Sequence, residues 1–129
     1  MRILQIDNQQ KLAQLMQDIK VDPYGIELML PKAVTHLVRI NLISNIAANI
    51  LKQEMLSFGG DVAIARGALT AKVTKTDCLL MGNVAQFSRL SEKLNRQPFG
   101  LSGLAVELSD AIKNYQKDNF IIDLGRHKL

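Results

Sequence analysis

"KQEMLSFGGDVAIARGAL", residues 52–69, places a glycine pair between an apolar-periodic run and a short apolar one. The pair Gly59–Gly60 can belong to a phosphate-binding loop or to the end of a helix. A dinucleotide-binding loop has its glycines after a strand and before a helix, so that the phosphate meets the helix N-terminus. The order here is reversed, and no Walker-type lysine follows. The pair therefore predicts a helix C-terminus, where glycine adopts the left-handed conformation at little cost.

The sequence on either side of the glycines extends this prediction. The preceding apolar residues share one broad helical stripe, made by Ile43, Ile46, Ala47, Ile50, Leu51, Met55 and Phe58. Ser44 is placed to cap the start of that helix. After the glycines, "DVAIA" predicts a buried strand, and "DCLLMG" (77–82) predicts a second one. The intervening "LTAKVTKT" (69–76) alternates, which suits an exposed strand or an extended loop.

Further from the glycines, strand and helix patterns alternate. "RILQI" (2–6), "THLVRI" (35–40) and "NFIIDL" (119–124) predict strands, whereas residues 8–19, 84–96 and 101–116 have helical periodicity. Pro31 leaves "IELMLPKA" (26–33) ambiguous, because proline interrupts a helix or a central strand. The order predicts an α/β fold: one compact domain, residues 1–129, with a mixed sheet of four or five strands covered by about four helices. The predicted buried set is Ile46, Ile50, Leu79, Leu80, Phe87, Leu108 and Ile112.

Composition narrows the class of protein. Of the 129 residues, 47% are hydrophobic and 22% are charged, which is typical of one globular domain. The apolar runs are shorter than the roughly 18 residues of a membrane span, and "MRILQIDNQQ" is not typical of a signal peptide. We therefore expect a cytoplasmic protein with no membrane partner. The net charge of +4 raises the question of nucleic acid, but basic residues are scattered and aromatics are only 5%, so none is predicted.

Motifs for chemistry are few. His36, His127 and Cys78 have no metal-ligand spacing, and Cys78 lies in an apolar run where a buried, inert thiol is expected. Ligands of α/β proteins gather where strands end and helices begin. Gly82 and Asn83 form such a junction, and Arg66 with Gly67 forms another. The alternative at each is a tight turn followed by a helix cap.

Five segments together carry a resemblance to a known family. They are "VDPYGIELMLPKA", "AANILKQEMLSFGGD", "ARGAL", "TDCLLMGN" and "RQPFGL". In this order they resemble the N-terminal domain that precedes the catalytic barrel in a long form of dihydropteroate synthase. The resemblance runs from about Asp22 to Leu129. Its ending, "FIIDLGRHKL", resembles the lead-in to the first barrel strand, so residues 119–129 are expected to lead into a barrel beyond these 129 residues.

The resemblance implies a role beside catalysis. The synthase joins a pterin diphosphate to p-aminobenzoate, with Mg²⁺ assisting, on barrel loops whose motifs have no counterpart here. A barrel needs about 250 residues. We therefore expect no catalytic residue and no cofactor in this chain, and an accessory domain that partners the barrel in cis or in trans. A homo-oligomer, a stand-alone small-molecule-binding or regulatory module that uses Arg66, Gly82 and Asn83, and a small enzyme of another type remain alternatives.

Overall fold

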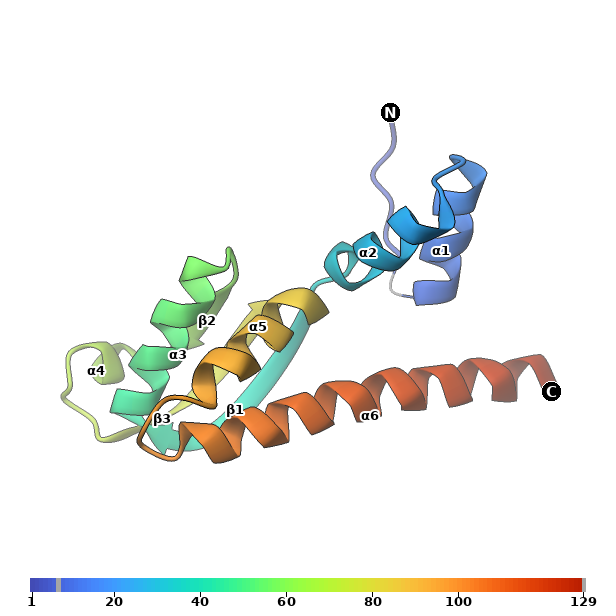
Figure 1. The fold of residues 1–129 in the computed structure, drawn as a ribbon. Coiled ribbons are helices and arrows are strands. Elements are labelled where there is room, and N and C mark those ends of the chain that lie inside the picture. Colours follow the sequence, from blue (N-terminus) through green and yellow to red (C-terminus); the bar gives the residue numbers. More distant parts are fainter. Residues whose placement is uncertain (7, 129) are drawn as a thin grey trace.

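The sheet at the centre of the molecule has three strands, β1 (His36–Ser44), β2 (Asp61–Ile64) and β3 (Lys75–Gly82), in the order β1-β3-β2 (Figure 1). The structure is a computed structural model that describes the backbone of residues 1–6 and 8–128 and the side chains of residues 1–6 and 8–115. Both outer strands run antiparallel to β3. They are therefore parallel to each other, and helix α3 (Asn45–Ser57) connects them across β3.

Helix α3 ends at the glycine pair, as the sequence predicts. Gly59 has a φ of +86°, and its N–H donates to the carbonyl of Leu56 at 3.2 Å. The N–H of Gly60 donates to the carbonyl of Met55 at 2.9 Å. These two bonds define a Schellman motif, which satisfies carbonyls that the helix leaves free. The prediction of a helix end is confirmed.

Gly60 has a second reason to be glycine. A Cβ there would lie 2.6 Å from the backbone oxygen of Met81 and 2.6 Å from Cε of Met55. The end of α3 thus approaches strand β3 too closely for any side chain. At the other end of α3, the hydroxyl of Ser44 accepts from the N–H of Ala47 at 3.1 Å, so the predicted cap is also confirmed.

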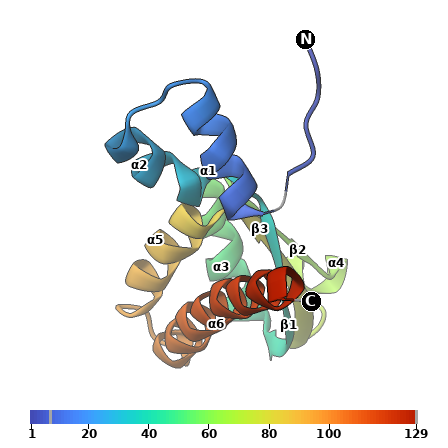
Figure 2. The same ribbon diagram turned by 90° about the vertical axis from the view of Figure 1, so that its right-hand side faces the viewer.

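One face of the sheet is covered by α3, α5 (Val84–Leu94) and α6 (Leu101–Lys128), which lie on the same side of the strands in Figure 2. Burial alternates along β3: Thr76, Cys78, Leu80 and Gly82 are buried and the residues between them are not. The core between sheet and helices contains Ala47, Leu51, Met55, Val62, Cys78, Leu80, Phe87, Leu90, Leu94, Leu101, Ala105 and Leu108.

The opposite face of the sheet is uncovered by these helices. We call it the open sheet face, and it carries Leu37, Ala63, Leu79 and Met81. Leu37 is 65% exposed. The ion pair between Arg39 and Asp77, at 3.0 Å, borders these apolar side chains. The sheet is therefore half-covered, as antiparallel sheets often are.

Two helices form a pair at the N-terminal end, α1 (Gln9–Asp18) and α2 (Pro23–Ala33) (Figure 1). Each begins at a side-chain cap, provided by Asn8 and Asp22. Pro31 lies inside α2, which settles the ambiguous segment as helix. The pair joins the rest of the molecule through α2 and α5, where Nδ2 of Asn83 donates to the carbonyl of Lys32 at 3.2 Å. Helix α4 (Arg66–Leu69) is a single turn between β2 and β3.

Several predictions about the sheet are wrong. The described residues form a three-stranded antiparallel sheet and six helices, in place of a mixed sheet of four or five strands with about four helices. "RILQI" has no regular structure, because it has no strand beside it with which to pair. Residues 119–124 continue the helix of α6, because the helical run before them contains no proline to stop it. Within the segment 69–76, residues 70–74 form a loop between α4 and β3, so the loop alternative holds for most of this segment.

The predicted core is confirmed in part. Leu80, Phe87 and Leu108 are buried, and Ile50, Leu79 and Ile112 are half-buried. The prediction for Ile46 is wrong, since its side chain is 49% exposed. The apolar stripe of α3 is wider than the face that the sheet covers, and the buried positions are Ala47, Ala48, Leu51 and Met55. In the described part of the chain, no helix has the length and apolar character that crossing a bilayer requires.

Candidate functional site

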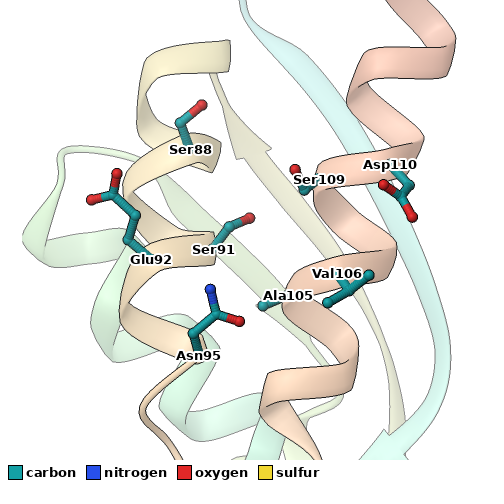
Figure 3. A pocket seen from close by; sticks show the side chains of 8 residues that line it. All are labelled: Ser88, Ser91, Glu92, Asn95, Ala105, Val106, Ser109 and Asp110. Atoms are coloured by element: carbon teal, nitrogen blue, oxygen red, sulfur yellow. The ribbon is translucent and has the colours of Figure 1, made fainter.

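A groove lined mostly by polar side chains lies between α5 and α6 (Figure 3). Its volume is about 360 Å³. We call it the polar groove, and its walls are Ser88, Ser91, Glu92 and Asn95 from α5 and Ala105, Val106, Ser109 and Asp110 from α6. The short side chains of serine and alanine leave space between two helices that otherwise pack closely. The groove is the concave, polar feature from which a binding site can be built.

Helical spacing explains why these residues share the groove. Positions 88, 91, 92 and 95 recur every three or four residues on α5, next to the core stripe of Phe87, Leu90 and Leu94. On α6, positions 105, 106, 109 and 110 have the same relation to Leu101 and Leu108. The groove thus follows the line where the apolar face of each helix gives way to its polar face.

Ser91 is the buried polar group of this groove. Its residue is 9% exposed, and its hydroxyl oxygen has no hydrogen-bond partner among the described residues. Figure 3 shows this hydroxyl directed toward α6, into the space between the helices. A buried hydroxyl without a partner costs about 1–3 kcal/mol. The free chain therefore carries an unsatisfied hydrogen-bonding group next to the groove.

The two carboxylates of the groove are also unpaired. The described residues form three ion pairs, and neither Glu92 nor Asp110 takes part in any of them. Among the residues that line the groove, Glu92 and Asp110 are the charged ones, and two cations of α5 have other contacts: Arg89 lies 4.7 Å from the ring centre of Phe58, and Lys93 lies 4.0 Å from Glu54. The polar groove is thus locally acidic in a chain whose net charge is +4.

The three candidates from the sequence do not come together. Gly82 ends β3 and Asn83 follows it, whereas Arg66 begins α4 beyond the far end of β2. The N–H of Ala65 donates to the hydroxyl of Thr76, which places Arg66 beside the start of β3. Six residues of strand, or about 20 Å, separate this point from Gly82. Arg66 and Gly82 therefore cannot hold one small ligand, and binding at each junction alone stays a prediction.

Internal packing accounts for Gly82 and Asn83. A Cβ at position 82 would lie 2.7 Å from Cε of Met55, so Gly82 allows α3 to approach β3. Oδ1 of Asn83 accepts from the N–H of Gln86 at 2.8 Å, and Oε1 of Gln86 accepts from the N–H of Asn83 at 2.8 Å. This reciprocal pair is a capping box, which fixes the start of α5. The turn and cap alternative explains both residues.

The titratable side chains of Cys78, His36 and Asp77 take part in packing or in internal hydrogen bonds. Burial raises the pKa of the Cys78 thiol, so Cys78 is a poor nucleophile. The His36 ring lies edge-on against Tyr115, with 5.4 Å between ring centres, and burial lowers the pKa of its imidazole. The N–H of Leu42 and the Arg39 guanidinium lower the pKa of Asp77. The described residues contain no group of three or more His, Cys, Asp or Glu side chains suited to a metal ion.

Sequence reasoning missed the polar groove. Helical periodicity over residues 84–96 predicts a helix, and the polar side of such a helix usually faces solvent. Two serines and an asparagine at positions 88, 91 and 95 share one stripe there, and this spacing was an available signal. The opposing stripe on α6 became relevant only when the fold placed the helices side by side.

The molecule is a two-layer α/β domain with an open antiparallel sheet. Its sequence is similar to parts of proteins whose names include dihydropteroate synthase. Over 106 residues, 82% of the chain, it is 36% identical to "Bifunctional dihydropteroate synthase/dihydropteroate reductase" of Helicobacter pylori. Over 107 residues it is 31% identical to "Probable bifunctional folylpolyglutamate synthase/dihydropteroate synthase" of Halobacterium salinarum. A protein of the same name from Haloferax volcanii is 34% identical over 65 residues.

The first two matches cover most of this chain and the third covers half of it, but each covers little of the relative. The matched segments are 28% of the Helicobacter protein, 13% of the Halobacterium protein and 8% of the Haloferax protein. No protein-family model matches the chain, and no solved structure matches it significantly. The chain is therefore homologous to a region of bifunctional proteins that contain a dihydropteroate synthase.

Proposed function

We propose that this chain is a non-catalytic domain that supports a dihydropteroate synthase barrel, present in the same polypeptide or as a separate subunit. One observation carries the proposal: the relatives differ in their second activity, but each name includes dihydropteroate synthase. The barrel would join the pterin diphosphate to p-aminobenzoate and would bind any Mg²⁺. A cytoplasmic location is part of the same proposal.

The length of a relative agrees with such a partner. Because 106 residues make up 28% of the Helicobacter pylori protein, about 270 of its residues lie outside the match. A (β/α)₈ barrel typically has about 250 residues. The segment that resembles this chain therefore accompanies a length of polypeptide sufficient for the catalytic domain.

The surface of this chain also suits a neighbouring domain. Leu37 on the open sheet face is 65% exposed, and Tyr24 and Leu28 on α2 are 68% and 51% exposed. On the open sheet face, Leu37 is paired with Met81, and neighbouring exposed apolar side chains of this kind are typical of interaction sites. Covering the open sheet face would bury Leu79 and Met81 completely and would add a second packed layer.

The test compares the barrel alone with the barrel joined to residues 1–129. We expect the joined protein to have a higher Tm, a higher kcat/KM, or both, and the separate changes would distinguish folding support from transition-state stabilisation. A joined protein with Leu79→Glu on the open sheet face is the matched variant, and it should lose the gain. Identical values for the barrel alone and the joined protein would contradict the proposal, as would synthase turnover by residues 1–129 alone.

A second candidate is a contribution to dihydropteroate reduction, which the name of the Helicobacter pylori relative suggests. The barrel alone and the joined protein test this candidate as well. Each protein is given dihydropteroate and a nicotinamide hydride donor, and the reduction of dihydropteroate is measured. If the joined protein reduces dihydropteroate and the barrel alone does not, while both keep equal synthase activity, the domain serves the reduction. If neither protein reduces it, the second candidate is rejected.

A further inference from the structure

The polar groove between α5 and α6 has more hydrogen-bonding capacity than the chain uses. None of the side chains of Ser88, Ser91, Glu92, Asn95, Ser109 and Asp110 has a polar partner within the described residues. Figure 3 shows the hydroxyls of Ser91 and Ser109 directed toward the space between the helices, with Glu92 on the side of α5 away from α6 and Asp110 on the side of α6 away from α5. Every one of these six groups can accept a hydrogen bond.

The charge of the groove specifies the complementary ligand. Glu92 and Asp110 place one carboxylate on each helix, and the nearby Arg89 and Lys93 contact Phe58 and Glu54 instead. Glu92 also lies in the last turn of α5, where the carbonyl end of the helix dipole favours positive charge. A ligand that donates several hydrogen bonds and carries positive charge complements both the acceptors and the field.

We propose that the polar groove binds a small molecule that carries an ammonium or a guanidinium group. The cationic group lies in the space between the two helices and donates to the hydroxyls of the serines, and Glu92 and Asp110 flank this space on its two outer sides. Ser91 can rotate among its staggered positions, which turns its hydroxyl from the buried position toward the ligand and satisfies it. The volume of about 360 Å³ is at the lower end of ligand sites, which suits a molecule of few atoms. This proposal is independent of a synthase partner.

The test uses the 129-residue chain and follows backbone amide NMR signals during titration. The compounds are agmatine, which carries a guanidinium and an ammonium, and 1,4-diaminobutane, with 1,4-butanediol as the uncharged compound of similar shape. We expect saturable shifts confined to α5 and α6 with a Kd of about 1 mM or weaker, because exposed ion pairs contribute little each. The diol should give none, and raising the salt should weaken binding.

Four variants locate the site. Glu92→Gln and Asp110→Asn should each weaken agmatine binding by about fivefold. Glu107→Gln removes an exposed carboxylate of α6 that lies outside the groove, so it should leave the Kd unchanged. Ser91→Ala should weaken binding but raise the Tm of the free chain, because it removes a buried hydroxyl without a partner. This opposite effect separates loss of binding from loss of folding.

Several outcomes would overturn the proposal. Equal shifts with the diol would show that charge is not recognised. If Glu107→Gln weakened agmatine binding as much as Glu92→Gln and Asp110→Asn do, binding would depend on the net charge of the chain and not on the groove. Amide shifts outside α5 and α6 would place binding elsewhere. An unchanged Kd in Ser91→Ala would remove the buried hydroxyl from the site.

Discussion

The sheet with α3 and α5 differs from the α1–α2 pair in what holds each together. In the first region, Leu51, Met55, Val62, Leu80, Phe87, Leu90 and Leu94 have no exposed surface. In the α1–α2 pair, Ile26 is the one buried residue. Both regions have well-formed helix caps, so the local signals are equally clear. Caps and periodicity therefore define where a helix forms, whereas the burial of its side chains determines how much that helix contributes to stability.

The consequence differs for each region. The core region closes on itself, because residues from the sheet, α3, α5 and α6 cover one another. The α1 helix has ten residues, fewer than the roughly 12–15 that an isolated helix needs to be stable in water. Its stability therefore depends on α2 and on whatever else covers its apolar side.

The largest loss of stability is expected from a substitution in the core region. Replacing Phe87 with Ala should reduce the free energy of unfolding by about 3–5 kcal/mol, because a fully buried ring is removed. The matched change in the other region, Leu28→Ala on α2, should stay within about 0.5 kcal/mol, since Leu28 is 51% exposed. Urea unfolding measures both. Equal losses would show that the α1–α2 pair is as tightly packed as the core.

Substitutions in the glycine pair should have an intermediate effect on the free energy of unfolding, and they test how α3 ends. Gly60→Ala should cost about 1–3 kcal/mol, because the new Cβ meets the backbone oxygen of Met81 and the chain must shift. Gly59→Ala should cost about 1 kcal/mol, from the positive φ alone, since its nearest neighbour at 3.5 Å is a side-chain atom of Gln86. Thermal melts rank the two. Two melts that match the unsubstituted chain would contradict the helix-end assignment.

The smallest effect is a pH dependence at the edge of the core. Burial lowers the pKa of His36 from 6.5, so the unfolded chain takes up this proton first as the pH falls. The stability that neutral His36 contributes is fully present above about pH 6.5 and is lost as the pH falls through the folded-state pKa. Melts at pH 7.5 and 5.5 should differ more for the unsubstituted chain than for His36→Phe. The same difference in both would show that other groups cause it.

Particular residues show how far sequence reasoning reaches. Ser44, Asn83, Gly59 and the stripe of Leu90 and Leu94 act through neighbours within a few residues, and each was predictable. The strand at residues 77–82 was also predictable from its apolar run. The exposed Ile46 was not, because the width of the covered face depends on the sheet against which α3 packs.

The candidate site follows the same division. Asn83 could be identified as a junction residue, but its engagement in a capping box follows from the position of Gln86 one turn later. Ser91 could be placed on a polar stripe. That its hydroxyl is buried without a partner depends on α6, whose contacts with α5 join residues about 15 positions apart in the chain.

The sequence by itself determined α1, α3, α5 and the first part of α6, the cap and the glycine end of α3, and the similarity to a region of dihydropteroate synthase-containing proteins. Tertiary structure alone decided that β3 lies between β1 and β2, that one sheet face stays open, and that two polar stripes meet in a groove. The physical reason is the separation along the chain of the residues that interact. Caps and helical periodicity are interactions over three or four residues, whereas strand pairing and helix packing join residues that only the folded chain brings into contact.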